Sequence, residues 1–154
     1  MQRHDPEVEQ LLVAAGWYPG RQVTDLVARW RGALESDGGF QLHPAAESVL
    51  LEYGGLVIDS HGPGRDLARA PLHLDPTLAL GEEDRLHEYF PELAGRDFFP
   101  LGETDNGHVF LAIDRGGAVV QVMDEVYGRW SSFERALESL LLGRRGSSYG
   151  EAAS

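Results

Sequence analysis

The densest group of side chains that could do chemistry lies in one short acidic segment. It contains Glu82, Glu83, Asp84, His87 and Glu88. On a helix, residues three or four positions apart share a face, so His87 would lie beside Glu83 and Asp84 and could help to hold a divalent metal ion. However, the macrodipole stabilises acidic side chains in the first turn of any helix. We therefore expect a solvated acidic helix over residues 81–90, and no metal site.

Two histidines at turns are the other candidates for acid–base chemistry. His61 lies in a loop rich in glycine and proline, and His108 follows an Asn-Gly turn. Neither has a sequence neighbour that would orient it as a general base, so we expect both to be surface histidines. His4, His43 and His73 show even less indication of a chemical role.

Short motifs and residue types exclude several kinds of site. The sequence has no Gly-x-Gly-x-x-Gly dinucleotide fingerprint and no His-Glu-x-x-His zinc helix, and without lysine it cannot form a Gly-Lys phosphate loop. The absence of cysteine excludes disulfides, thiolate metal ligands and a cysteine nucleophile. We therefore expect a protein that works by binding another protein, with no catalytic residue, cofactor or metal.

Tryptophans near arginines are a combination found where nucleic-acid bases stack. Trp17, Trp30 and Trp130 have Arg21, Arg29, Arg31 and Arg129 close by in sequence. Trp30 falls on the apolar stripe of an expected helix, which predicts a core position. The net charge, considered below, also opposes binding to nucleic acid.

Three helices are expected in the first third of the chain. Asp5 and Pro6 are typical of an N-cap and a first helical position, and Gly16 ends this helix. Thr24 is expected to cap a second helix, which residues 36–39 break. Its apolar stripe comprises Leu26, Val27, Trp30, Ala33 and Leu34. A third helix is expected from about Pro44 to Tyr53.

A sheet and one closing helix are expected in the rest of the chain. Strands are predicted at residues 56–58, 72–74, 98–102, 108–113 and 118–123, with 72–74 at an edge. Short turns at 105–107 and 114–117 require antiparallel neighbours. Ser131 and Glu134 predict a capping box for a helix that Gly143 ends. The fold class is α+β, with the N-terminal helices and a C-terminal helix packed on an antiparallel sheet. We expect a single domain over residues 1–143 and a disordered tail over 144–154.

The 154 residues carry a formal net charge of −12, from 25 acidic and 13 basic residues. Because such a chain repels phosphates, we expect no direct binding to nucleic acid or to an anionic membrane. The charge would suit a basic protein partner, although acidity also keeps proteins soluble. The N-terminus is too polar for a signal peptide, and no segment approaches the roughly 20 apolar residues of a membrane span. A cytoplasmic location is therefore expected.

Four segments, in order along the chain, form a pattern. Residues 11–21 are similar to an "aGW-x-PGR" opening, residues 50–56 to "fl-x-x-yGGL", and residues 99–103 to "yPlGe". Residues 111–114 with 116–119 are similar to the hairpin that follows. In these features the chain resembles the SUKH-3 branch of the SUKH (Smi1/Knr4-related) superfamily, from about Leu11 to Gly143.

The resemblance implies a SUKH-like fold and an immunity protein that binds and neutralises a cognate bacterial toxin inside the producing cell. Many toxins neutralised by this superfamily are nucleases or deaminases, so an acidic inhibitor could occlude a basic active-site cleft. One alternative is a protein-interaction adaptor or regulator of the same fold outside a toxin system. Another is a small enzyme or ligand-binding domain that uses His61, His108 or the acidic helix.

Two groups of residues are separated on this basis. The expected partner surface comprises Glu82, Glu83, Asp84, Glu88, Asp124 and Glu125, the last two after the last predicted strand. The residues expected to build the fold are Trp17, Pro19, Gly20, Arg21, Gly54, Gly55 and Gly102, because family motifs mark a fold and not a partner.

Overall fold

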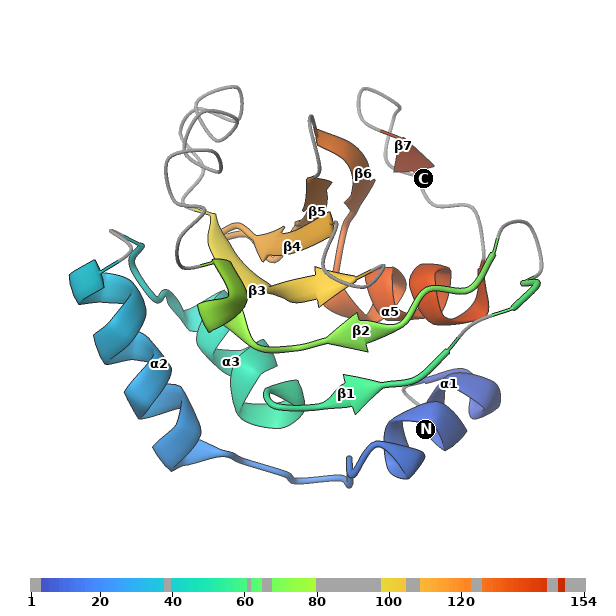
Figure 1. Cartoon of the computed structure of the whole chain (residues 1–154), viewed down its shortest axis with the longest axis horizontal. Helices are drawn as coiled ribbons and strands as arrows, with labels where there is room; N and C mark the ends of the chain where they lie inside the picture. The colour runs from blue at the N-terminus through green and yellow to red at the C-terminus, as the bar shows by residue number, and fades with distance from the viewer. Residues whose placement is uncertain are drawn as a thin grey trace.

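The computed structural model in Figure 1 describes residues 4–37, 40–60, 62–64, 68–79, 98–104, 109–122, 126–143 and 147–148. Its helices are α1 (Pro6–Ala14), α2 (Thr24–Asp37), α3 (Pro44–Tyr53), the 3₁₀ helix η1 (Pro76–Ala79) and α5 (Phe133–Leu142). Its strands are β1 (Val57–Ile58), β2 (Leu72–His73), β3 (Phe99–Thr104), β4 (Val109–Ile113), β5 (Val119–Val122), β6 (Val126–Trp130) and β7 (Ser147–Ser148). The predicted α+β class is confirmed.

The first three helices form where local sequence signals predict them. The Asp5 side chain accepts a hydrogen bond from the Glu7 N–H at 2.9 Å, and Pro6 occupies the first turn of α1. On α2, Val27, Trp30 and Leu34 are buried, as their helical spacing predicts. These helices therefore follow from caps and apolar periodicity.

The described strands form a seven-stranded antiparallel sheet in the order β1 to β7, so each strand pairs with its neighbours in sequence. The prediction of residues 72–74 as an edge strand is wrong, because β2 pairs with both β1 and β3. The edge is β1 instead, where Val57 is 60% exposed while Ile58 is fully buried. Val57 pairs with His73 on β2, which in turn pairs with Glu103 on β3. These three side chains lie on the face of the sheet opposite to the buried side chains of Ile58, Leu72 and Thr104.

Two strands lie where the sequence analysis places none. Residues 126–130 form β6, paired with β5 through a register shift near Val122. As a result, Asp124 and Glu125 lie between two strands of the sheet and not after its last one. Ser147 and Ser148, in the segment expected to be a disordered tail, form β7 against Gly128 and Arg129. Glycine is uncommon inside strands, so Gly128 weakens the sequence signal for β6. The two serines of β7 give no strand signal of their own, and they are identified as a strand by their pairing with β6.

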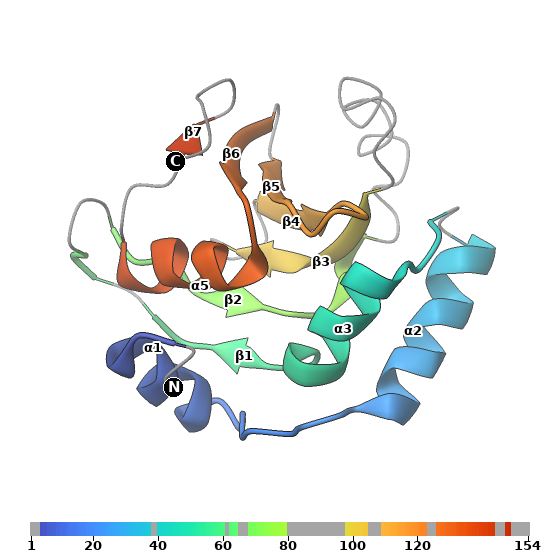
Figure 2. The same ribbon diagram turned by 180° about the vertical axis from the view of Figure 1, so that it is seen from behind.

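Helices α3 and α5 lie on one face of the sheet, and α1 packs against α5 and against the edge strand β1 (Figure 2). The last carbonyls of α5 are satisfied by the chain between β1 and β2: Leu140 O accepts from the Ala70 N–H, and Leu141 O from the Ser60 hydroxyl. The N-cap of α5 is Ser132, whose hydroxyl accepts from the Arg135 N–H, so the predicted capping box of Ser131 and Glu134 is wrong by one residue.

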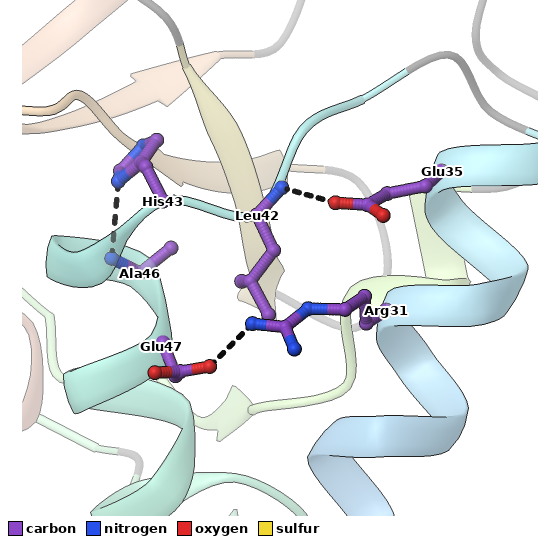
Figure 3. Close-up of polar contacts among 6 residues, drawn as sticks. All are labelled: Arg31, Glu35, Leu42, His43, Ala46 and Glu47. Carbon is purple, nitrogen blue, oxygen red and sulfur yellow. Dashed lines mark hydrogen bonds and ion pairs between the residues drawn. The ribbon is translucent and has the colours of Figure 1, made fainter.

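Polar contacts hold α2 beside α3 (Figure 3). Arg31 on α2 forms an ion pair with Glu47 on α3, and the Glu35 carboxylate accepts from the Leu42 N–H at 3.1 Å. The His43 imidazole caps α3, since its Nδ1 accepts from the Ala46 N–H at 3.3 Å. Arg31 and Glu47 are substantially exposed, and such pairs typically contribute about 0–1 kcal/mol. The buried cap therefore matters more at this junction than the ion pair.

Candidate partner-binding site

The acidic residues predicted to meet a partner all lie outside the described residues, as do His61, His87 and His108. The described strands fix only where the two acidic segments join the sheet. Residues 80–97 lead into β3 at Phe99, which pairs with Ile113, at the C-terminal end of β4. Residues 123–125 follow Val122, which pairs with Phe110, near the N-terminal end of β4. The two acidic segments therefore join the sheet at opposite ends of its strands.

The C-terminal end of α3 is held by Arg21 from the connection between α1 and α2. Arg21 Nη1 donates to the Glu52 carbonyl and Nη2 to the Gly54 carbonyl, both at 2.8 Å. A cation is favoured there because a helix C-terminus carries partial negative charge and unsatisfied carbonyls. Burial lowers the pKa of Arg21 below its usual value, and nearby Tyr18 raises it by less. The guanidinium is thus tied to the backbone of the helix end.

Trp17 and the N-terminal segment pack onto the same helix end. The indole N–H of Trp17 donates to the Glu52 carboxylate at 3.0 Å, and the ring packs edge-on against His4. The imidazole Nε2 of His4 lies 2.8 Å from the Tyr53 hydroxyl, in buried surroundings. These contacts connect the segment before α1, the connection after it and the end of α3.

Two glycines of the four sequence segments, Gly54 and Gly102, sit where a side chain would collide. A Cβ added at Gly54 would lie 2.6 Å from the Trp30 ring and 2.4 Å from the Leu50 carbonyl. A Cβ added at Gly102 would lie 2.1 Å from the His73 carbonyl, where the register of β3 and β4 shifts between Pro100 and Gly102. Close approach of backbone or ring thus accounts for both glycines.

An open pocket of about 460 Å³ adjoins this helix end. Its lining comes from three segments: the connection between α1 and α2, the C-terminal half of α3 and the first turn of α5. The polar residues of the lining are Arg21, Gln22, Ser48, Glu52, Tyr53 and Glu134. Because Ser132 is the N-cap of α5 and its bond goes to the N–H of Arg135, Glu134 is not the capping-box partner that the sequence suggests. It lines the pocket instead.

The pocket combines negative charge with an exposed aromatic residue nearby. Glu52 and Glu134 bring carboxylates, whereas the one cation in its described lining, Arg21, is bonded to α3 carbonyls. The turn that lines the pocket with Gly20 and Arg21 also carries Tyr18, whose carbonyl accepts from the Arg21 N–H and whose side chain is 57% exposed.

Sequence reasoning missed the pocket residues and two buried histidines. Glu52 and Glu134 line one pocket although they lie far apart in sequence, so neither gives a local signal. His43 is 2% exposed, and its Nε2 lies 3.1 Å from the Ile113 carbonyl. Since Nδ1 accepts from a backbone N–H, Nε2 is the donor. Both histidines therefore serve packing and hydrogen bonding in the described structure.

The described residues offer few groups for catalytic or metal chemistry. They contain no group of three or more His, Asp or Glu side chains placed to hold a metal ion. We expect no Gly-x-Ser-x-Gly motif from the sequence, but residues 146–150 match this pattern, with Ser148 in the serine position. A nucleophile elbow joins a strand to a helix, whereas Ser148 lies in β7, paired with Gly128 in a sheet. None of the described helices has the length and hydrophobicity needed to cross a membrane.

Comparisons with known proteins agree with the four segments noted in the sequence. The family described as SUKH-3 immunity protein matches residues 4–143, which is most of the chain. Searches of curated proteins and of solved structures found no match. The matched region begins at His4 and ends at Gly143, so it includes every helix described above and six of the seven strands. The chain belongs to the SUKH-3 immunity protein family.

Proposed function

We propose that this protein binds a cognate toxin in the cytoplasm of the producing cell and neutralises it by occluding its active site. The observation that carries the proposal is the family match over residues 4–143. Immunity proteins of this kind act by binding, so the role requires no catalytic residue. The protein is proposed to act without a cofactor and without catalysing a reaction.

The charge supports a toxin that acts on nucleic acid. A nuclease or deaminase must bind a polyanion, so its substrate cleft is positively charged. This chain carries a formal charge of −12. Complementary charge speeds the encounter of two proteins and excludes like-charged partners. An acidic inhibitor is therefore suited to a basic cleft, and competes there with the polyanionic substrate.

We propose that the acidic segments contribute to this encounter. The residues are Glu82, Glu83, Asp84 and Glu88 in one segment and Asp124 and Glu125 in the other. Because the segments join the sheet at opposite ends of its strands, each is best tested separately.

The test is to co-express this chain with the protein encoded by the adjacent gene. We expect the chain to restore growth of cells that produce the toxin and to copurify with a catalytically inactive toxin variant. The purified complex should lose nuclease or deaminase activity in proportion to bound inhibitor. Replacing Glu82, Glu83 and Asp84 together by arginine should slow association roughly tenfold at low salt, and less at high salt, because encounter is electrostatically steered.

Several outcomes would contradict parts of the proposal. Copurification without growth rescue would support an adaptor of the same fold and not an inhibitor. Inhibition of a toxin that acts on protein or lipid would keep the immunity function and overturn the nucleic-acid target. An unchanged association rate for the triple variant would remove residues 82–84 from the interface, and the double variant Asp124→Arg, Glu125→Arg would then test the other segment.

A further inference from the structure

We infer that the toxin docks at the open edge of the sheet, where an extended segment of the toxin pairs with β1 as a further strand. This inference rests on the proposed function, since it names the surface and the binding mode by which the partner is engaged. The occupant is an extended segment of a basic protein. Its main chain would pair with Val57 on β1, the outermost strand of the sheet (Figure 1).

The hydrogen-bonding groups of the Val57 main chain point away from the sheet. In an antiparallel ladder, hydrogen-bonded and non-hydrogen-bonded pairs alternate along the two strands. The Leu74 N–H donates to the Leu56 carbonyl at 3.0 Å, which makes the next pair, Val57 with His73, a non-hydrogen-bonded one. The N–H and C=O of Val57 therefore face the open edge, and neither has a hydrogen-bond partner in the part of the chain that the structure describes.

The Val57 side chain is exposed at a position where a protected edge would carry a charge or a proline. Val57 is 60% exposed, between Leu56 and Ile58, which are 2% and 0% exposed. Helix α1 packs against β1 and still leaves Val57 open. Natural sheets commonly block their edges with charged residues, proline or a bulge, because an open edge is a template for another strand. A β-branched residue at this position favours pairing instead.

The two edges of the sheet differ in residue type. The other edge is β7, where Ser147 and Ser148 pair with β6. Valine is among the residues that strands favour, and serine is not. Of the two edges, β1 is therefore the one suited to receive a strand.

Charge selects a basic partner over a second copy of this chain. Pairing of two copies at β1 would bring together chains that each carry a formal charge of −12, and their mutual repulsion opposes it. The exposed residues along the edge are Gly55, Val57 and Asp59, so the edge itself also carries negative charge. A basic segment is attracted by the whole chain and by this edge. We therefore expect an apolar or β-branched toxin residue opposite Val57, with arginine or lysine beside it.

The first experiment follows amide hydrogen exchange of the full chain by NMR, free and bound to a catalytically inactive variant of the toxin encoded by the adjacent gene. The Val57 amide should exchange rapidly in the free chain and at least about 100-fold more slowly in the complex, because it gains a hydrogen bond. The Ile58 amide faces β2 and is the internal control, since it should be protected in both states. Rapid exchange of the Val57 amide in a stable complex would overturn the inference.

Two substitutions at position 57 separate the main chain from the side chain. Val57→Pro removes the N–H that would bond to the toxin, and the fold should tolerate it because this N–H faces the edge and not β2. Val57→Thr is the matched control, because it keeps both the N–H and the β-branched shape. We expect toxin affinity to fall about 100-fold for Val57→Pro and less than about threefold for Val57→Thr. Thermal unfolding of both variants checks that the fold is retained, and if Val57→Pro does not fold, the hydrogen-exchange result decides alone.

The remaining outcomes identify which part of the inference fails. Equal affinities of Val57→Pro and Val57→Thr would show that no strand is added at β1. Protection of the Val57 amide in the chain alone at high concentration, with a doubled mass in sedimentation, would make a second copy the occupant and overturn the assignment to the toxin. If the unaltered chain neither binds the toxin nor rescues growth, the proposed function itself fails. If it does both while the Val57 amide stays unprotected, only this inference fails.

Discussion

Helix α3 begins at the His43 imidazole and ends at the Arg21 guanidinium, and the two ends differ in what surrounds them. At the N-terminal end, His43 is 2% exposed and joins the helix to the Ile113 carbonyl of β4. At the C-terminal end, Arg21 joins the Glu52 and Gly54 carbonyls beside an open pocket. The first end is buried and joins the helix to the sheet. The second end is held by side-chain hydrogen bonds beside a pocket that is open to solvent.

The largest effect is expected from Gly54→Ala at the C-terminal end. A Cβ there would lie 2.4 Å from the Leu50 carbonyl and 2.6 Å from the Trp30 ring, so backbone and core must both shift. Overpacking of this kind costs about 3 kcal/mol in the free energy of unfolding. Urea denaturation followed by circular dichroism measures the loss.

Gly32→Ala is the matched control for this prediction. Gly32 lies on α2 with nothing within 4 Å of an added Cβ, so the same substitution should stabilise the protein by about 0.5–1 kcal/mol. If Gly54→Ala were as well tolerated as Gly32→Ala, the packing of Trp30 against the end of α3 would not be needed.

Helix α3 also shows what the sequence could predict. Its bounds, Pro44 to Tyr53, follow from a proline that starts a helix and two glycines that stop it, which are local signals. The hydrogen bonds that hold its two ends cannot be predicted from local sequence, because Trp17–Glu52 and His43–Ile113 join residues 35 and 70 positions apart. The same limit explains β2: a two-residue strand gives no local sign of whether one or two neighbours flank it.

The sequence predicts the negative charge of a partner-binding surface but not where on the fold that surface lies. The net charge of −12 indicates a basic partner without showing where it binds. Runs of acidic residues drew attention to two segments, whereas the pocket is assembled from single carboxylates on α3 and α5. The spacing of Ser131 and Glu134 predicts a capping box, but Ser132 is an equally suitable cap, and only the observed helix start decides between them.

A smaller effect is expected from His43→Ala at the N-terminal end. The substitution removes the cap of α3, which typically contributes about 1 kcal/mol, and leaves the buried Ile113 carbonyl without its donor, which costs about 1–2 kcal/mol. A total loss of about 2–3 kcal/mol should appear in urea denaturation, with no change in toxin binding once the loss of folded protein is corrected for.

His43→Asn separates the two contributions. The shorter amide can still cap the helix, since asparagine is among the preferred N-cap residues, but it does not reproduce the reach of Nε2 to Ile113. We expect it to recover about 1 kcal/mol of the loss. If His43→Asn were no better than His43→Ala, the cap would contribute nothing and the link to β4 would account for the whole effect.

The smallest effect on stability is expected from Arg21→Lys, and it distinguishes the two ends most sharply. Lysine keeps the charge but presents one ammonium group, which cannot reproduce the two parallel bonds to Glu52 and Gly54. Because the site is partly open to water, which can replace a lost donor, the cost in unfolding free energy is about 1 kcal/mol. Arg31→Lys, in the exposed pair with Glu47, is the control and should change stability by less than about 0.5 kcal/mol. A loss as large as that expected for His43→Ala would mean that water does not replace the lost donor at this end of the helix.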